Sequence, residues 1–156
     1  KRQPMQDLLT EEHRAWIGKA EPTRTVEISR RDIVKYAVAT EQCQKKYLEG
    51  DEAPPMFIFN LFSTVREIEA LRPDGLPRGS GQGPRLPLRR VMAGGTEIHQ
   101  YQPIRPGDRL SGTQRITDMY EKQGSTGPLI FTVRTLAITN ESGEPVLDEV
   151  QTAIAR

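Results

Sequence analysis

Alternation of apolar and polar residues dominates the second half of the chain. It extends over residues 91–101, 109–121, 128–139 and 146–155, and Gly, Pro, Asp and Asn residues separate these stretches. Residues 23–28 alternate in the same way. In the last stretch, Leu147, Glu149 and Gln151 share one face. We predict five strands, the last four of which form an antiparallel meander with each strand beside the next.

The first part of the chain carries signals of short helices. Thr10 is a candidate N-cap, followed by acidic residues that suit the first turn of a helix. Ser29 opens a sequence similar to a capping box, and the apolar residues after it have helical spacing. We therefore predict a helix from about Arg30 to about Glu41. Residues 1–14 are expected to form a peripheral helical arm.

The most apolar segment of the chain follows Ala53. Its apolar residues fall on more than one side of a helical projection, which is typical of a buried helix, and Pro is favoured at a helix start. We predict a long central helix from Pro55 to Leu71, with Phe57 and Leu61 on the face toward the sheet. The opposite face would then be free for a ligand or a partner.

Residues 73–88 include eight Gly or Pro in sixteen positions, a density that regular helices and strands do not tolerate. We expect a long irregular loop, with a function and simple surface mobility as open alternatives. The Gly-rich stretch 79–84 lacks the Lys-Ser/Thr pair and the following helix of a phosphate-binding loop. It is therefore not interpreted as one.

Composition narrows the class of protein. The length of 156 residues fits one domain, and we assign residues 1–156 to it. The 22 basic and 21 acidic residues leave a net charge of +1, which gives no electrostatic case for nucleic acid or an anionic membrane. We find neither an apolar stretch long enough to span a bilayer nor a secretory signal. Cys43, as a single cysteine, forms no internal disulfide and fits a reducing compartment, so a cytoplasmic protein is expected.

Side chains able to do chemistry are scattered. No grouping of His, Cys, Asp and Glu has the spacing of a metal site, and no Ser or Cys lies in a nucleophile-elbow sequence. His99 is interpreted as an ordinary sheet-face residue, with a place in a ligand tunnel as the alternative, and His13 as solvated. The pair Gly94-Gly95 at a strand start is interpreted as a bulge.

Three segments resemble MaoC-like dehydratases. The first two are Tyr36-Ala-Val-Ala39 with Asp51-Glu-Ala-Pro-Pro-Met-Phe57, and Met92-Ala-Gly-Gly-Thr-Glu-Ile98 with Tyr101-Gln-Pro-Ile-Arg-Pro-Gly-Asp108. The third is Asp118-Met-Tyr-Glu-Lys-Gln-Gly124 with Gly127-Pro-Leu-Ile-Phe131. The resemblance covers about residues 15–156 and is to the N-terminal, FAS1-like dehydratase domain of that family. Pro87-Leu-Arg-Arg90 and the loop before it most resemble the N-terminal half of 3-methylfumaryl-CoA and mesaconyl-C4-CoA hydratases and of hydroxyacyl-thioester dehydratases.

The resemblance implies an α+β hot-dog fold, in which an antiparallel sheet wraps around one long central helix. It implies reversible hydration of a trans-2-enoyl thioester, with a coenzyme A thioester as substrate and no metal or redox cofactor. The catalytic residues of the family do not carry over. Where its catalytic half has Asp-x-Asn-Pro-x-His, this chain has Gln42 for Asp, Lys45 for Pro and Tyr47 for His. Gln accepts no proton at neutral pH and Tyr is a poor base there, which leaves Glu41, one position away, as the alternative.

These substitutions imply a non-catalytic or substrate-shaping half of an enoyl-CoA hydratase or 3-hydroxyacyl-thioester dehydratase. A catalytic MaoC-like chain or domain would pair with it side by side and supply the Asp and the His. A homodimeric acyl-thioester-binding or structural module and an acyl-CoA thioesterase remain alternatives, because one fold hosts several functions. Steroid, branched dicarboxylate and fatty acyl groups all remain open.

Two sets of residues are candidates for binding the substrate. The acyl pocket is expected at the central helix, on Met56, Phe57, Asn60 and Leu61. The phosphates of coenzyme A are expected at Arg85, Arg89 and Arg90, since arginine forks suit such groups. Solubility, or a salt bridge to the partner, is the other reading of these three arginines.

Overall fold

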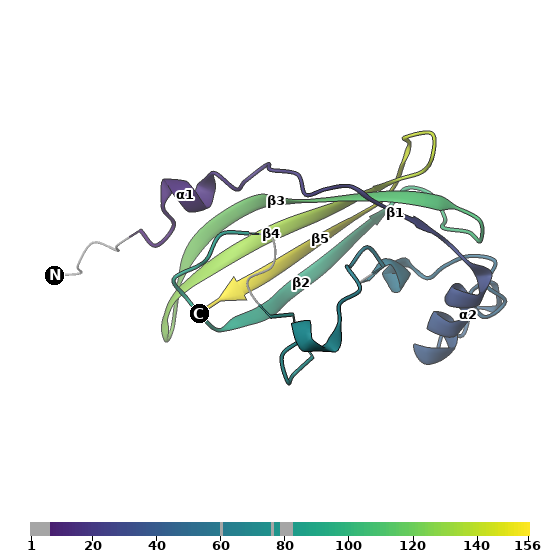
Figure 1. Ribbon diagram of the computed structural model, residues 1–156, viewed down its shortest axis with the longest axis horizontal. Coiled ribbons are helices and arrows are strands. Elements are labelled where there is room, and N and C mark those ends of the chain that lie inside the picture. Colours follow the sequence, from purple (N-terminus) through teal and green to yellow (C-terminus); the bar gives the residue numbers. More distant parts are fainter. Residues whose placement is uncertain (1–6, 60, 76, 79–82) are drawn as a thin grey trace.

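The structure is a computed structural model that describes residues 7–59, 61–75, 77–78 and 83–156. Within these residues the strands form one antiparallel sheet in the order β1-β3-β4-β5-β2 (Figure 1). The strands are β1 (Arg24–Glu27), β2 (Val91–Gln100), β3 (Arg109–Gly124), β4 (Gly127–Thr139) and β5 (Pro145–Ala155). The helices are α1 (Glu11–Arg14), α2 (Arg30–Ala39), α3 (Lys45–Leu48) and the short 3-10 helices η1 (Pro55–Ile58) and η2 (Ile68–Ala70). The five predicted strands are confirmed, each close to its expected bounds.

The predicted meander of four strands is correct only for β3, β4 and β5. Strand β2 pairs with β5 and lies at the opposite edge of the sheet from β1. The connection over residues 101–108 is longer than the usual hairpin loop, and its Ile104 is completely buried in the core. This segment therefore crosses the end of the sheet to reach β3, instead of turning back beside β2. The bulge expected at Gly94-Gly95 is confirmed by the register shift between Ala93 and Gly95.

Two hydrophobic clusters lie on the same face of the sheet, here called the inner face. The first cluster joins Ile33 of α2 and Ile58 of η1 to strand residues such as Leu110, Leu136 and Leu147. The second lies toward the other end and consists of Leu9, Ile116, Met119, Ile130 and Ala155, with Leu8, Leu86 and Leu88 packed against it. Helices α2 and α1 lie at these two ends of the molecule (Figure 1). The inner face is thus covered at both ends by different segments of the chain.

The predicted central helix from Pro55 to Leu71 was wrong. Among its described residues the segment forms only the short helices η1 and η2, and the backbone of Phe59 is extended after η1. Val65 is 96% exposed and Ile68 78% exposed, so the apolar residues here do not surround a buried axis. Ser, Thr and Val follow one another over residues 63–65, and all three have low helix propensity. None of the described helices is long and apolar enough to cross a membrane.

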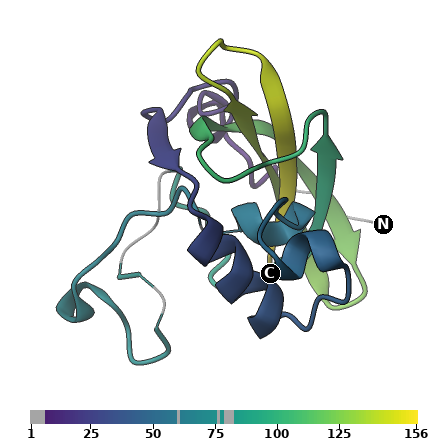
Figure 2. The ribbon, with the colours of Figure 1, turned by 90° about the vertical axis from the view of Figure 1, so that its right-hand side faces the viewer.

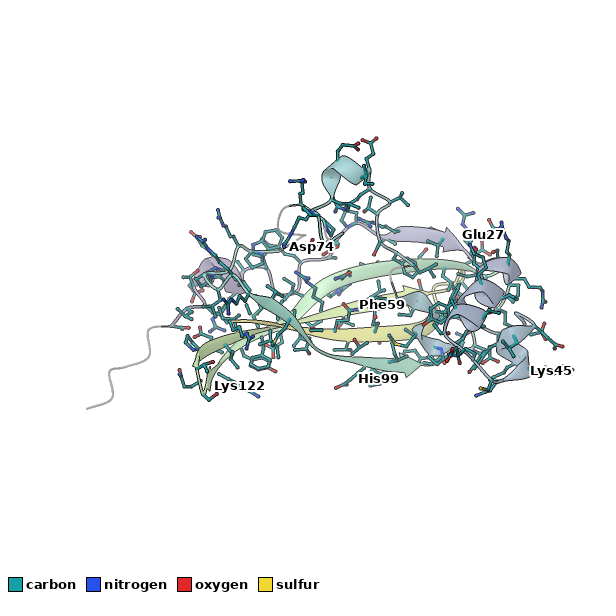
Figure 3. The ribbon with its side chains drawn as sticks, turned by 90° about the horizontal axis from the view of Figure 1, so that it is seen from below. Glu27, Lys45, Phe59, Asp74, His99 and Lys122 are labelled. Atoms are coloured by element: carbon teal, nitrogen blue, oxygen red, sulfur yellow. The ribbon has the colours of Figure 1, made fainter. Side chains whose placement is uncertain are left out.

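Helix α2, with 10 residues, packs against one end of the sheet (Figure 2). The predicted helix from Arg30 to Glu41 is therefore confirmed. Its predicted cap is present too, since the Asp32 backbone N–H donates to Ser29 Oγ at 3.1 Å. Figure 3 shows Lys45 at this end and Lys122 at the far end of the sheet.

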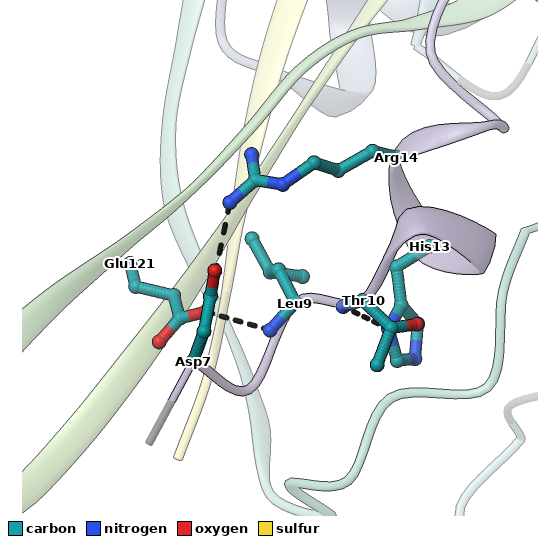
Figure 4. Close-up of polar contacts among 6 residues, drawn as sticks. All are labelled: Asp7, Leu9, Thr10, His13, Arg14 and Glu121. Atoms are coloured by element: carbon teal, nitrogen blue, oxygen red, sulfur yellow. Dashed lines mark hydrogen bonds and ion pairs between the residues drawn. The ribbon is translucent and has the colours of Figure 1, made fainter. Parts of the chain in front are cut away.

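The N-terminal arm is attached to the second cluster. Leu9 is buried there, and its backbone N–H donates to Glu121 Oε1 at 2.6 Å (Figure 4). Thr10 precedes α1, as predicted, and its backbone N–H donates to His13 Nδ1 at 3.0 Å. Residues 1–6 of the predicted arm lie outside the described residues, and Leu9 anchors the described part to the core.

Candidate functional site

A cavity of about 420 Å³ opens on the inner face between the two hydrophobic clusters. Strands β1, β3, β4 and β5 form its floor, and the segments around η1, η2 and the following loop form its walls. The residues that line it are Glu21, Pro22, Arg24, Ile58, Phe62, Ser63, Thr64, Arg66, Leu71, Gly75, Pro77, Gly112, Gln114, Arg134, Leu136, Glu149 and Gln151. The space is located where a long central helix was expected.

Four polar side chains form the floor of this cavity, and we call Gln114, Arg134, Glu149 and Gln151 the polar seam. Arg134 and Gln151 are direct cross-strand partners, and Gln114 and Glu149 both flank Leu136. Neighbours of this kind lie within side-chain reach of each other. The polar seam therefore crosses three adjacent strands.

Glu149 is the most buried member of the polar seam, with 5% of its surface exposed. Gln151 Nε2 donates a hydrogen bond to Glu149 Oε1 at 2.8 Å. Burial raises the pKa of Glu149 from its ordinary value, and the hydrogen bond from Gln151 opposes this with a smaller effect. The carboxyl group is thus shifted toward its neutral form while it faces the cavity.

A second carboxyl group, Glu21, lines the same cavity. Burial raises its pKa, and the positive charges of Arg134 and Arg24 act in the opposite direction. Arg24 also donates from Nη1 to the carbonyl oxygen of Phe62 at 2.8 Å. This bond ties strand β1 to the segment that follows η1, so that the wall of the cavity is attached to its floor.

The three described residues of the predicted acyl pocket do not line the cavity. Phe57 is buried in the first cluster, Leu61 packs against that cluster from its margin, and Met56 is 38% exposed. Asn60 lies outside the described residues. The near neighbours Ile58 and Phe62 line the cavity instead. The sequence analysis chose its side chains from a helical projection, whereas the described part of the segment contains only short 3-10 helices.

The polar seam was missed by sequence reasoning, although a signal existed. The sequence pattern puts Glu149 and Gln151 on the same face as Leu147, and Leu147 is completely buried. A charged residue on the face of a buried leucine indicates either a misassigned strand or a polar site. Side chains also alternate between the two faces of β4, so Arg134 lies on the inner face, as Leu136 does two residues later.

Two of the three predicted phosphate-binding arginines come together. Arg89 and Arg90 line a second pocket, of about 640 Å³, with Arg156, which the sequence analysis did not single out. Arg90 and Arg156 are joined by two backbone hydrogen bonds of 3.1 and 2.8 Å. Arg85 does not line this pocket, and its carbonyl oxygen accepts from His13 Nε2 at 3.1 Å. His13 is therefore a bridge between the arm and the loop and not the solvated side chain that was predicted.

The residues that the resemblance matches to the family's acid and base, Gln42 and Tyr47, line neither of these pockets. Gln42 follows α2, and its Nε2 donates to Thr40 Oγ1 at 3.2 Å. Tyr47 is buried in α3, and Glu41 lies at the end of α2 with a positive φ of 54°. His99 is exposed on β2, 3.7 Å from Glu97, which confirms the sheet-face interpretation. Within the described residues, no group of three or more His, Cys, Asp or Glu side chains could hold a metal ion.

Comparison with known proteins agrees with the architecture. The antiparallel sheet is that of a hot-dog fold, as predicted, but the described residues do not include the long central helix. Residues 15–149 match the family described as FAS1-like, dehydratase domain region, and the chain belongs to this family. It is similar to mesaconyl-C(4)-CoA hydratase of Chloroflexus aurantiacus, with 27% identity over 117 residues. That match covers 75% of this chain and 41% of the relative, so the chain spans about two fifths of that protein's length.

Solved structures share the fold at lower sequence identity. The ChsH1-ChsH2 complex of Mycobacterium tuberculosis matches with a TM-score of 0.62 and 15% identity, over 87% of this chain and 83% of that chain. The HadBC (3R)-hydroxyacyl-ACP dehydratase complex of the same organism matches with a TM-score of 0.60 and 16% identity, over 90% and 97%. The R-hydratase PhaJ1 of Pseudomonas aeruginosa matches with a TM-score of 0.57 and 18% identity, over 89% and 81%. The chain therefore has the hot-dog fold of hydratases and dehydratases.

Proposed function

We propose that this chain is the non-catalytic, substrate-holding half of an acyl-thioester hydratase or dehydratase. A second hot-dog chain or domain supplies the acid and the base. The observation that carries the proposal is the placement of Gln42 and Tyr47. By the sequence resemblance they stand where the family has its acid and base, and neither lines the cavity on the inner face. The chain thus has a space for a substrate without the family's means of moving protons in it.

The free edge of β2 is the surface that we assign to the partner. In the part of the chain that the structure describes, β2 pairs only with β5, and nine of its ten residues are exposed. Val91 is 67% and Met92 41% exposed on this strand. A long strand with an unpaired edge is a template for another strand. The sheet of a partner would extend this sheet through β2, and two solved hot-dog neighbours are complexes of two named chains.

The second pocket supports a coenzyme A thioester as the ligand. Arg89, Arg90 and Arg156 bring three guanidinium groups to one place, and such groups bind phosphates through forked hydrogen bonds. Within the described residues, none of the three forms an ion pair with a carboxylate. Pro128 in this pocket and Arg134 in the cavity are six residues apart on β4, roughly 20 Å of extended strand. The phosphates and the acyl group of one ligand would therefore lie at two separate places along the sheet.

We also propose that the reaction needs no metal or redox cofactor and takes place in the cytoplasm. Hydration of an enoyl thioester adds one water molecule across the Cα=Cβ bond, as a proton on Cα and a hydroxyl group on Cβ, and needs no oxidant or reductant. Cys43 is exposed and unpaired, which suits a reducing compartment.

Activity of the chain with and without its partner tests the proposal. The partner is the product of a neighbouring reading frame, or the remainder of a longer protein, that carries an Asp-x-Asn-Pro-x-His sequence. We expect the purified chain to leave crotonyl-CoA unchanged and the pair to hydrate it, with Gln42→Ala and Tyr47→Phe both tolerated in the pair. Hydration by the chain alone that is lost in Glu41→Gln would overturn the proposal and assign the base to Glu41.

The mode of pairing has its own experiment. Val91→Lys places a charge on the β2 edge and should prevent assembly in analytical ultracentrifugation. The control is Val38→Lys, which adds the same charge to an exposed position of α2. Assembly that survives Val91→Lys but not Val38→Lys would assign the contact to the helical end. Association of the chain with itself at β2 would instead favour the homodimeric acyl-thioester-binding module.

A further inference from the structure

The face of the sheet opposite the inner face, here called the outer face, changes in character along the strands. Side chains alternate between the two faces, so the neighbours of the buried Met119 and Ile130 point outward. At this end, strand register aligns one aromatic and apolar row across four strands: Tyr120, Phe131, Ile154 and Met92. Nearer α2, the same strands align a largely polar row: Thr113, Ala137, Asp148 and His99. Figure 3 labels His99 in the polar row and Lys122 beyond the apolar row. Only the polar row has the composition expected of a sheet face in water.

The apolar row is partly exposed. Met92 is 41% exposed, and the other three members keep part of their surface accessible. Among the described residues, none of the four belongs to either hydrophobic cluster. The rings of Tyr120 and Phe131 stack with their centres 4.8 Å apart, and Lys122 Nζ lies 5.3 and 5.2 Å from those centres. Aromatic side chains that are already ordered in an open apolar patch are typical of a protein interface.

A row between these two has opposite charges at its ends. From β3 to β2 it consists of Arg115, Thr135, Val150 and Glu97. Arg115 and Glu97 are both exposed, and Glu97 lies 3.7 Å from His99 on its own strand. Three strand spacings, about 14 Å, separate the backbones of Arg115 and Glu97, so the two charges do not meet within one chain. The outer face therefore carries a positive and a negative group on opposite sides of its apolar end.

This arrangement is self-complementary under a two-fold rotation. An axis that runs along the strands between β4 and β5 exchanges β3 with β2 and β4 with β5. Arg115 of each copy then lies opposite Glu97 of the other copy, and Tyr120 lies opposite Met92, whose sulfur suits contact with an aromatic ring. An axis across the strands, midway between these two rows, would instead place Met92 against Glu97. The first axis thus matches charge with charge and apolar surface with apolar surface.

We propose that two copies of this chain pack back to back through the outer faces of their sheets, about the axis between β4 and β5. Packed sheets lie about 10 Å apart with strand directions within about 30°, a gap that an arginine and a glutamate span together. The patch covers four strands and the part of β4 from Leu129 to Thr135, roughly 450 Å² at the usual strand dimensions. A standard interface buries about 800 Å² per partner, so we expect a dimer with a dissociation constant in the micromolar range. The edge of β2 stays free, and the contact is independent of the pairing under the proposed function.

Sedimentation equilibrium of the full chain from about 1 to 200 µM, which brackets a micromolar dissociation constant, tests the proposal. The dimer should persist in Val91→Lys, which blocks the β2 edge. Arg115→Glu and Glu97→Arg each place like charges opposite one another twice per dimer, and each should weaken the dimer at least about 10-fold. The double variant exchanges the two charges and should restore the dissociation constant to within about threefold. The control Arg31→Glu, the same change at an exposed position of α2, should leave the dimer unchanged.

Three results would overturn the proposal. The first is a monomer at every concentration. The second is a dimer that Val91→Lys abolishes, because the copies would then meet at the β2 edge. The third is a dimer that neither single reversal weakens, or that the double variant fails to restore, because Arg115 and Glu97 would then not face each other. The charge exchange can be made in the otherwise unaltered chain, so it decides the question even if Val91→Lys fails to fold. None of these results depends on hydratase activity, which tests the proposed function separately.

Discussion

The ring of Phe62 lies directly against the backbone of Gly112. A Cβ atom added to Gly112 would be 2.7 Å from the Phe62 ring, closer than such atoms approach in proteins. Both residues line the cavity, and Phe62 follows η1 whereas Gly112 belongs to β3. The contact therefore sets how closely the wall of the cavity approaches its floor, and it requires the absence of a side chain at residue 112.

Gly112→Ala is expected to destabilise the protein by about 1–3 kcal/mol, the usual effect of an added group in a packed site. Either the Phe62 ring or the backbone of β3 must move to make room. Urea unfolding measures the change in the free energy of unfolding. Gly95→Ala is the matched control on β2, since no atom lies within 4 Å of a Cβ added there. Equal stability of the two variants would show that the Phe62 ring is not held against β3.

A substitution at the end of α2 is expected to raise the stability of the protein instead of lowering it. Gln42 N–H donates to the carbonyl of Ala37 and Glu41 N–H to that of Val38, which is a Schellman cap with Glu41 at the left-handed position. A residue with a Cβ destabilises the fold by roughly 1–2 kcal/mol in the left-handed conformation, and glycine avoids this cost. Glycine also has more conformational freedom in the unfolded chain, which cancels part of the benefit. Glu41→Gly should therefore stabilise the chain by about 0.5–1 kcal/mol in thermal or urea unfolding. Glu41→Ala separates the two causes. A stabilisation of the same size in this variant would mean that the carboxylate, and not the backbone, is the source.

The N-terminal arm is expected to contribute to stability through one residue. Leu9 is 2% exposed within the second cluster, and its neighbour Leu8 only packs against the margin of that cluster. Leu9→Ala should cost about 2–5 kcal/mol, the range for a buried leucine. Leu8→Ala should cost clearly less, and the two can be compared by urea unfolding. Similar small losses for both would show that the arm is detached in solution.

Strands β3, β4 and β5 were predictable because their buried residues lie on one face, so the period of two is visible in the sequence. The order of the strands in the sheet was not predictable from this alternation. The path of β2 to the edge beside β5 depends on a connection over residues 101–108 that buries Ile104 across the end of the sheet. Local patterns contain no information about which strand a long connection reaches.

The candidate site was predicted less well than the fold, and the reason is physical. The segment after Pro55 has many apolar residues, which favoured a helix, but hydrophobicity measures burial and not conformation. Phe57 and Ile58 are indeed buried, although they belong to a single 3-10 turn. The cavity exists because that turn ends at once, and the polar seam below it is formed by residues on three different strands. The residues of the polar seam lie close together because of the register between strands, and a local sequence pattern does not predict that register.

Stability should depend on pH through Glu149. Burial raises the pKa of this carboxyl group above its ordinary value of 4.5, so the folded protein holds the proton more tightly than the unfolded chain does. The stability contributed by the neutral carboxyl group is therefore fully present below pH 4.5. It is lost as the pH rises from there through the raised pKa of the folded state. Glu21 shifts in the same direction and adds to the effect.

Glu149→Gln removes the charge while its side-chain oxygen can still accept the hydrogen bond from Gln151. We expect the variant to have a higher melting temperature than the unaltered protein at pH 7, because no ionised group is then buried beside the cavity. The difference should shrink as the pH is lowered toward 4, where the carboxyl group of the unaltered protein is already neutral. Glu97→Gln, on the exposed β2 strand, makes the same chemical change where solvent surrounds the side chain, and its effect at pH 7 should be smaller. Calorimetric melting of the three proteins at several pH values measures these differences. A variant that melts lower than the unaltered protein at pH 7 would mean that an ionised Glu149 is stabilised by the cavity arginines. The charge inside the cavity would then be balanced by the protein itself.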